Sequence, residues 1–534
     1  MSLARNAFVQ ASLTMASRIL GFARDLMVAA RFGQGPYSDI WATALMFPNL
    51  FRRLFAEGAF AQAFVPVYAK VQAESGDAEA ERIASDSLSF LLFVVGAVCI
   101  VMQVAMPWIM HALLSAYVDR PEIFTLAIFV TQITMPYLFF MTMASLLSGV
   151  LNTRGKFALS AAVLILFNLC TLAPLVLMPP GRVNALYAVG AAVTVSGVLQ
   201  AGFLWWGVRR AGVRLGVHWP RLTAGVKQIL ALAVPGAIAG GATQINSLVS
   251  QALTGSDEGA RSVLYNSDRL YQLPLGIVGT AIGLALVPRL TRAFALKDQK
   301  DADGALDDGV ALSMAFSAPA AVALFVMPYL IIDSTLTRGA FTHADAHRTA
   351  AVLFHFAWGV PAFVLAKVFT PPFFARQDTK RPMRYALITV ALNVVLGVSL
   401  FFGMSAAGMD GVIGLGIATS AAAWVNIALL TGTLAREGAY KISARLWGRL
   451  LRIGVACLVL GGFLAVCALN YRVLTHLLWR KEIVVLAVSA AGALLYAALA
   501  FASGAVTWAE VRGALRRERG GAVPAGDLPI GLDG

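Results

Sequence analysis

Apolar stretches long enough to cross a bilayer recur along the whole sequence, and this recurrence limits the folds open to the chain. A helix needs about 20 apolar residues to cross the hydrocarbon core. Fourteen such stretches can be marked, at 4–31, 39–70, 86–113, 122–152, 157–178, 185–211, 223–253, 260–290, 309–333, 344–374, 384–404, 411–435, 446–470 and 482–506. Because backbone polar groups must be satisfied within lipid, such spans form helices. The sequence predicts an all-α integral membrane protein with about 14 transmembrane helices.

The basic residues are unevenly distributed between the two sides of these expected spans. The chain is 59% hydrophobic and 13% charged, with a net charge of +14. Lys and Arg are roughly threefold more frequent at the N-terminus, in the even-numbered connections and in the C-terminal tail than in the odd-numbered connections. This bias predicts that both termini are cytoplasmic. The positive charge therefore reflects membrane topology, and nucleic acid is not an expected partner.

Two local features bear on targeting and on metal or disulfide chemistry. The first apolar run continues through Arg18 and Arg24 with no small-residue cleavage pattern, so it reads as a retained span and not as a signal peptide. The four cysteines all fall inside expected spans and lack the spacing of metal ligands. They are expected to be buried small hydrophobes.

Charged residues inside the spans are the strongest functional signal. Facing lipid at the centre of a helix, each would cost about 2.5–3.5 kcal/mol, so they must face water, one another or a ligand. Five of the six basic residues that lie away from the span ends are in the first, second and eighth spans, and the acids are few. These basic residues are Arg18, Arg24, Arg52, Arg53, Arg269 and Lys367; the acids are Asp25, Glu57 and Asp268, with Asp39 at the entrance of the second span.

Internal pairing accounts for only part of this set. Arg53 and Glu57 are four residues apart on one helix face, Arg18 and Asp25 are seven apart, and Asp268 adjoins Arg269. These three pairs leave a positive excess, which predicts a water-filled cationic cavity that contains Arg24, Arg52 and Arg269. The planar guanidinium fork suits phosphate and carboxylate oxygens. An anionic substrate is expected, such as a phosphate or diphosphate, although the spacing alone does not choose among anions.

The sequence also contains a faint internal repeat. "EGAFAQAFVP" at 57–66 aligns without gaps with "GTAIGLALVP" at 279–288, and "LNTRGKF" resembles the later basic turn "FARQDTKRP". Two parallel six-span lobes are expected, which suits lobes that rock about a central site. Gly21 and Pro48 are hinge candidates because they lie beside the charges. The expected divisions are an N-lobe at 1–215, a C-lobe at 216–440, two further spans at 441–507 and a cytoplasmic tail at 508–534.

Four motifs carry a resemblance to a known family. "SRILGFARDLMVAARFG", "FPNLFRRLFAEGAFAQAFVPVYAK", "NSDRLYQLPLGIVGTAIGLALVPRL" and "PPFFARQDTKRPM" resemble the MurJ (MviN) lipid II flippases of the multidrug/oligosaccharidyl-lipid/polysaccharide exporter superfamily. The resemblance covers essentially the whole chain. It implies alternating-access transport of lipid II, the lipid-linked peptidoglycan precursor, from the inner to the outer leaflet of the bacterial cytoplasmic membrane, in support of the cell wall and cell shape.

The resemblance also implies roles for individual residues. By motif, the substrate-binding residues are Arg18, Arg24, Arg52 and Arg269. Supporting or gating roles fall to Asp25, Asp39, Arg53, Glu57, Asp268 and Gln272. Asp25 is expected to orient the arginines, and Arg53 and Glu57 to brace the site. Gln272 is a departure, because many relatives have an acid there. No catalytic or metal-binding residue is expected.

Energy supply and partners follow from the same comparison. The chain lacks a phosphate-binding loop of the Walker type, so the membrane potential is the expected driving force and no cofactor is expected. The seventh and eleventh spans contain no Asp or Glu, which does not favour sodium coupling, although Gln244, Asn246, Gln251 and Asn393 offer neutral oxygens. Expected partners are lipid II, membrane lipids and the cell-wall synthesis machinery. A groove near the last two spans is expected to hold the polyprenyl tail.

Three other functions remain open at this level. The nearest is an exporter of other polyprenyl-diphosphate-linked saccharides or of drugs. A drug exporter would not need Arg24, Arg52 and Arg269. A membrane enzyme acting on polyprenyl diphosphates would hold Mg²⁺ with clustered carboxylates, whereas the acids here are solitary. A purely structural scaffold is disfavoured by the cost of the charges within the spans. A transporter is therefore expected in preference to an enzyme.

Overall fold

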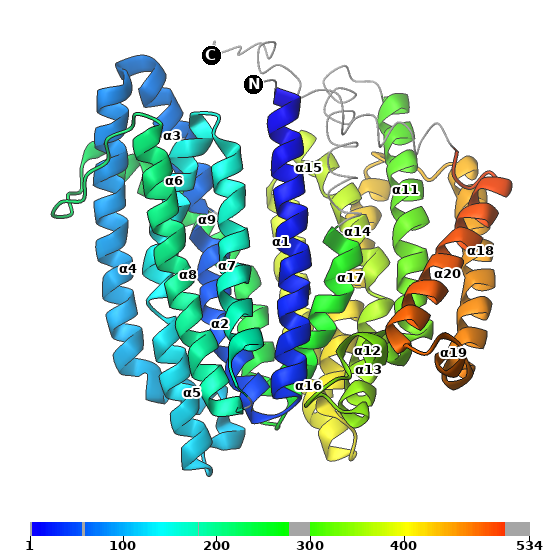
Figure 1. The fold of residues 1–534 in the computed structure, drawn as a ribbon. Coiled ribbons are helices and arrows are strands. Elements are labelled where there is room, and N and C mark those ends of the chain that lie inside the picture. Colours follow the sequence, from blue (N-terminus) through cyan, green and yellow to red (C-terminus); the bar gives the residue numbers. More distant parts are fainter. Residues whose placement is uncertain (1–2, 56–58, 180, 277–298, 377, 508–534) are drawn as a thin grey trace.

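The computed structural model describes residues 3–55, 59–179, 181–276, 299–376 and 378–507. Helices make up nearly all of these ranges, which contain no strand (Figure 1). Ten helical stretches within them are long and apolar enough to cross a membrane. The expectation of an all-α membrane protein is confirmed.

The first part of the chain forms eight α-helices and one short 3₁₀ helix, η1. Their bounds are α1 Leu3–Phe32, α2 Pro36–Phe55, α3 Ala59–Ser75, α4 Asp77–Leu113, η1 Ser115–Tyr117, α5 Pro121–Thr134, α6 Tyr137–Thr153, α7 Phe157–Leu177 and α8 Arg182–Arg210. The described parts of the stretch expected as a span at 39–70 are helical and belong to α2 and α3. Helix α1 runs unbroken through Gly21 and α2 runs unbroken through Pro48, so neither hinge candidate interrupts its helix here.

The second part begins with a long helix and continues through several shorter ones. The bounds are α9 Ala224–Thr254, α11 Gln299–Val326, α12 Pro328–Leu336, α13 His343–Ala357, α14 Val360–Phe369, α15 Pro371–Ala375, α16 Lys380–Ala406, α17 Gly411–Arg436, α18 Ala444–Leu469, α19 Tyr471–Leu478 and α20 Lys481–Ala502. A further helical segment at 260–276 lies between α9 and α11. Proline starts α12 and α15 and is the second residue of α14, where its missing N–H costs no helical hydrogen bond.

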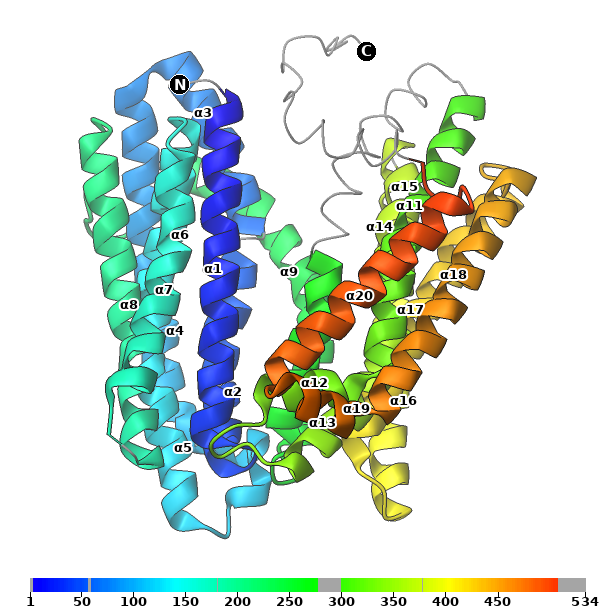
Figure 2. The same cartoon turned by 45° about the vertical axis from the view of Figure 1, so that its right-hand side comes forward.

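The helices gather into two bundles (Figure 2). Helices α1–α8 form the first bundle, and α11–α20 form the second. The bundles diverge toward the side where α1 begins and α20 ends, and they approach each other at the opposite side, called the distal side below. Helix α9 connects them, because it packs on α3 and α4 and also on α16.

The end of α1 makes one of the distal contacts between the bundles. Ala29 is buried in a cluster with Val263 and Phe341 of the second part. The backbone N–H of Ala340 donates to the carbonyl of Ala30 over 2.7 Å, and Gln34 Nε2 donates to the carbonyl of Asp345 over 2.8 Å. Apolar burial and backbone hydrogen bonds together hold α1 against the loop before α13.

Replacing Gly339 by alanine should weaken this contact. Gly339 has φ +58°, and a Cβ atom there would lie 2.3 Å from the Ala30 carbonyl oxygen. The left-handed conformation alone costs a non-glycine residue about 1–2 kcal/mol, and relief of the overlap would break the hydrogen bond from Ala340. We expect a lower thermal unfolding midpoint in detergent. The control is Gly403→Ala, where no neighbouring atom lies within 4 Å of the added Cβ; an unchanged midpoint for Gly339→Ala would contradict this prediction.

Candidate functional site

Helix α1 supplies three charged side chains to the site. Arg18 and Asp25 are seven residues apart and therefore lie on nearly the same face of the helix, while Arg24 points about 100° away. That difference decides their neighbours, because Arg24 reaches α7 and Asp25 reaches the segment at 260–276. One helix thus connects charges in both halves of the molecule.

Arg24 is held within the first bundle. Its Nε and Nη2 donate to Asp25 Oδ1 over 3.1 and 2.8 Å, and its Nη1 donates to Asn168 Oδ1 over 3.2 Å. The Phe167 ring lies 5.4 Å from the guanidinium carbon. Asn168 is itself fixed, since its amide nitrogen donates to the carbonyl and the hydroxyl of Ser17 over 2.9 and 3.0 Å. These contacts leave the Arg24 residue only 4% exposed.

Asp25 joins the two bundles electrostatically. Its Oδ1 accepts from Arg24 and also from the Tyr265 hydroxyl, over 3.1 Å in the second case. Its Oδ2 lies 3.3 Å from Arg269 Nε. One buried carboxylate therefore lies between a cation from the first bundle and a cation from the segment at 260–276, so the local charge is positive by one unit.

Arg269 is the more accessible of the two arginines that contact Asp25. Its Nη2 donates to the Tyr265 hydroxyl over 3.1 Å, and its guanidinium carbon lies 5.1 Å from the centre of the Tyr265 ring, which is four residues earlier on the same helical segment. Its side chain is 40% exposed. An arginine held on one side by a carboxylate and a tyrosine, and open on the other, can receive an anion.

The other predicted residues near this cluster have different surroundings. Arg18 is exposed, and a Cβ added to Gly276 would lie 2.8 Å from its Nη1, so its head lies beside the segment at 260–276 and not on Asp25. Gln272 Nε2 donates to Asp268 Oδ2, so these two groups bind each other. The pairing expected between Arg18 and Asp25 is wrong, because Arg24 and Arg269 are the cations that Asp25 contacts.

The expectation that Arg24 faces a water-filled cavity also needs correction, because burial and three hydrogen bonds occupy this guanidinium in the described conformation. The side chains of Arg52 and Arg53 and the whole of Glu57 lie outside the described residues. Of the arginines predicted to bind substrate, Arg18 and Arg269 are the ones described as accessible.

Asp39 lies in a separate network at the distal side, near the start of α2. Its Oδ2 accepts from the backbone N–H of Gly259 over 2.8 Å, and its Oδ1 accepts from that of Ser262, also over 2.8 Å. The Tyr117 hydroxyl donates to Oδ2 over 2.7 Å. A carboxylate from the first bundle thus caps the N-terminus of the helical segment at 260–276, where backbone N–H groups and the helix dipole favour negative charge.

Tyr117 supports this cap as a permanent hydrogen-bond donor. Burial raises the pKa of its hydroxyl, and the neighbouring Asp39 carboxylate raises that pKa further. Because both causes favour the neutral form, Tyr117 keeps its proton throughout the physiological pH range. The cap therefore retains all three donors.

Sequence reasoning missed several residues of these networks, among them Ser17, Tyr117, Asn168, Arg261 and Tyr265. Arg261 is fully buried and donates to Thr43 Oγ1, to the Leu113 carbonyl over 2.6 Å and to the Gln251 carbonyl. It lies inside the span expected at 260–290, so its charge was a usable signal. Asn168, a single amide within the apolar run of α7, was another.

The chemistry that the arrangement supports is anion binding. Within the described ranges, no group of three or more His, Cys, Asp or Glu residues is placed to hold a metal ion. An apolar cavity of about 470 Å³ lies between α11, α18 and α20, and its lining includes Phe316, Leu460, Gly492 and Tyr496. The molecule thus offers accessible cations between the bundles and an apolar cavity beside the last two long helices.

Comparison with known sequences gives one consistent family. The family model described as "Lipid II flippase MurJ" matches residues 28–509. A probable lipid II flippase MurJ from Rhizobium tropici is 36% identical over 535 residues, with 99% of each chain covered. The lipid II flippase MurJ of Burkholderia cenocepacia is 32% identical over 480 residues, with 88% of this chain and 91% of that protein covered.

Solved structures agree on the fold. A lipid II flippase MurJ structure in an "inward closed conformation" aligns with a TM-score of 0.74 at 22% identity, covering 92% of this chain and 98% of the other. An inward-facing multidrug resistance transporter of the MATE family aligns with a TM-score of 0.66 at 16% identity, covering 80% and 98%. At these identities the similarity establishes the architecture alone.

Proposed function

The chain belongs to the MurJ family of lipid II flippases, and we propose from this premise that it carries lipid II across the bacterial cytoplasmic membrane. The family match over residues 28–509 is the observation that carries the proposal. The protein is a multi-pass membrane transporter and not an enzyme. Its substrate joins a polyprenyl tail to a sugar and peptide headgroup through a diphosphate, so the protein must accommodate an anion within an apolar environment.

Arg269 and Arg18 are the groups that we assign to the diphosphate. Arg269 is half-exposed and is held at 3.3 Å by a single carboxylate, Asp25, which Arg24 also contacts. A diphosphate carries more negative charge than one carboxylate and offers several oxygens, so it competes effectively for the guanidinium. Binding would therefore transfer Arg269 from Asp25 to the substrate.

This exchange provides a physical link between binding and movement. The contact between Asp25 and Arg269 joins the first bundle to the segment at 260–276. When the diphosphate binds Arg269, the contact between Asp25 and Arg269 is lost. The first bundle and the segment at 260–276 are then held together by the diphosphate that both contact. A ligand can shift a conformational equilibrium only through such differential contacts. We propose alternating access in which the bundles rock about this site as two lobes.

The direction of opening follows from the charge distribution. The bundles diverge at the side where α1 begins and α20 ends and approach at the distal side (Figure 2). The positive-inside rule assigns the chain termini to the cytoplasm. We therefore interpret the described conformation as open to the cytoplasmic leaflet and closed by the Asp39 network at the distal side. The polyprenyl tail would remain in the lipid and contact the lining of the apolar cavity beside α18 and α20. The delivered lipid then becomes available to the cell-wall synthesis machinery outside.

The substrate assignment is tested by transport of defined molecules into or out of sealed vesicles. The purified protein should move fluorescent lipid II between leaflets, and unlabelled lipid II should compete. A cationic drug should neither be transported nor compete, because the accessible charges of the site are positive. Efficient drug transport without lipid II movement would instead indicate a multidrug exporter.

The membrane potential is the driving force that we propose. Moving one elementary charge across 100 mV is worth about 2.3 kcal/mol, which corresponds to a roughly 50-fold ratio at equilibrium. An anionic headgroup leaving a negative compartment moves in the favourable direction. We expect lipid II movement to slow severalfold when the potential is collapsed with a potassium ionophore. Replacing sodium by choline should leave the rate unchanged, whereas a rate that follows sodium and ignores the potential would contradict this mechanism.

A further inference from the structure

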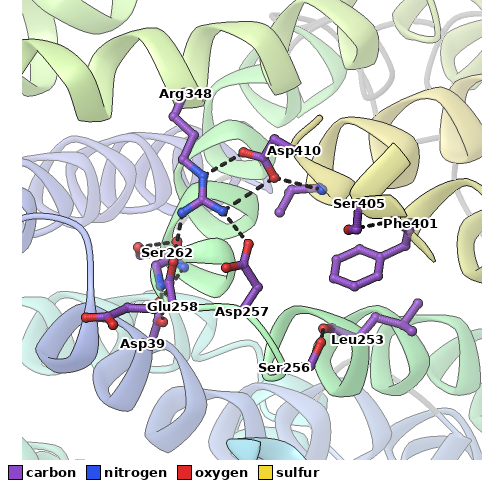
Figure 3. Close-up of polar contacts among 12 residues, drawn as sticks. Asp39, Leu253, Ser256, Asp257, Glu258, Ser262, Arg348, Phe401, Ser405 and Asp410 are labelled. Carbon is purple, nitrogen blue, oxygen red and sulfur yellow. Dashed lines mark hydrogen bonds and ion pairs between the residues drawn. The ribbon is translucent and has the colours of Figure 1, made fainter. Parts of the chain in front are cut away.

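Arg348, on α13, lies between two loops of the second part of the chain (Figure 3). Each nitrogen of its guanidinium has a partner. Nε donates to Asp410 Oδ2 over 2.6 Å, Nη1 donates to the carbonyl of Glu258 over 2.8 Å, and Nη2 donates to Asp257 Oδ2 over 2.5 Å. One side chain thus joins α13 to the loop at 255–259 and to the loop before α17.

The side of Arg348 that faces α17 is firmly anchored. Asp410 is the N-cap residue of α17, and its Oδ1 accepts from the backbone N–H of Val412 over 3.0 Å. A carboxylate at a helix N-terminus is stabilised by the helix dipole and by the free N–H groups there. Arg348 is therefore tied to the end of a long helix, and its other contacts are with the loop at 255–259.

That loop also contacts the first bundle at the distal side. The Gly255 carbonyl accepts from the backbone N–H of Ala116 over 3.0 Å, Glu258 pairs with Arg120 over 2.9 Å, and the Gly259 N–H donates to Asp39. These three contacts occur within five consecutive residues. The shape of the loop therefore determines whether the Asp39 cap can form.

Gly259 shows how closely Arg348 defines that shape. It has φ +77°, and a Cβ atom there would lie 3.1 Å from Arg348 Nη1. Gly259 is the left-handed residue at which the loop turns, directly against the guanidinium. Asp257 and Glu258, which precede it, bind the same guanidinium. No contact from Arg348 to the first bundle is needed for this effect, because the guanidinium acts through the loop.

We infer that Arg348 is a positioning residue: it holds the loop at 255–259 in the conformation that Asp39 recognises, and so sets how firmly the distal side closes. This inference rests on the proposed alternating access, for which distal closure must be reversible. The described contacts fit that need, since Arg348 is only partly buried and the Asp257 side chain, on the loop, is 46% exposed and can exchange the guanidinium for water. Loss of Arg348 should shift the population toward distally open molecules.

The test is the accessibility of residue 262, whose backbone N–H binds Asp39. Ser262 is 2% exposed, and a Ser262→Cys substitution is nearly isosteric. In a background lacking the four native cysteines, the protein in lipid nanodiscs is treated with a charged thiol reagent. Arg348→Ala should raise the labelling rate about tenfold or more, the shift expected from losing a charge-assisted hydrogen bond. The labelling rate of Arg348→Lys should lie between those of the parental protein and Arg348→Ala, because lysine keeps the charge but lacks the planar guanidinium.

The matched control is Arg376→Ala, which removes an arginine of the same exposure paired with a carboxylate, Glu437, away from the loop at 255–259. It should label at the parental rate. If Arg348→Ala does not fold, Asp257→Ala removes one of the same contacts and should also raise labelling. Parental labelling in folded Arg348→Ala would overturn the inference. Because the readout needs no lipid II, raised labelling of Arg348→Ala together with a native protein that moves no lipid II would support the role of Arg348 and refute the proposed function.

Discussion

Replacing Asp39 by alanine is expected to destabilise the protein by about 3–5 kcal/mol, the range for removing one partner from a buried charged network. Asp39 is fully buried and accepts three hydrogen bonds, two of them from backbone N–H groups at 259 and 262. Alanine would leave both N–H groups and the Tyr117 hydroxyl without an acceptor, and each orphaned group costs about 1–3 kcal/mol. Tyr117 belongs to the first bundle, whereas residues 259 and 262 belong to the second part of the chain. The substitution should therefore weaken closure of the distal side as well as lower the stability of the protein.

The measurement is the thermal unfolding midpoint in detergent, followed by labelling of residue 262 as above. Asp39→Asn should cause a smaller loss, because one amide oxygen can still accept while the amide nitrogen faces a donor. Asp119→Ala is the control, since it is the same change at an exposed position two residues after Tyr117. An Asp39→Ala protein with the native midpoint and native labelling would show that the cap contributes little.

Replacing Arg269 by alanine is expected to weaken diphosphate binding by about 10- to 100-fold, the factor for one or two charge-assisted hydrogen bonds. Its guanidinium is accessible and is held by Asp25 and Tyr265, so its removal should affect the ligand more than the fold. The measurement is the dissociation constant of a short-chain prenyl diphosphate for the purified protein. Arg269→Lys should recover part of the affinity.

Arg24 provides the contrast to this prediction. Because it is buried and bound to Asp25 and Asn168, its loss should lower the unfolding midpoint, with the diphosphate affinity of the protein that still folds falling less than in Arg269→Ala. Arg82→Ala, which removes an exposed arginine paired with Glu79, should change neither quantity. If Arg269→Ala binds the diphosphate as tightly as the native protein, then Arg269 does not contact the ligand.

The fold class could be predicted from sequence because it depends on local composition. Repeated apolar stretches require helices in lipid, and the helices are found where those stretches lie. The division of 344–374 into α13, α14 and α15 was missed, since apolar residues lie on both sides of each boundary. Hydropathy reports the environment of a segment and not where one helix ends and the next begins.

The candidate site was only partly predictable, for a different physical reason. The cost of charge in lipid identified Arg24, Asp25 and Arg269 as residues that need partners, but it could not name those partners. Asn168 binds Arg24 across 144 residues, and Tyr265 binds Asp25 across 240. Such pairings depend on how the helices pack, so no local pattern contains them. The same holds for Asp39, whose acceptor role at a helix N-terminus 220 residues away appears only in the folded chain.

The most direct test of the proposed function is lipid II movement in sealed vesicles that contain the native protein or Arg269→Ala at matched amounts. Fluorescent lipid II is placed in one leaflet, and its appearance in the other is followed with an impermeant quencher under an imposed potential. The native protein should move lipid II well above protein-free vesicles, and Arg269→Ala should approach that background. If the native protein moves none, the assignment of lipid II as substrate is contradicted. Normal movement by Arg269→Ala would instead contradict the assignment of Arg269 to the diphosphate.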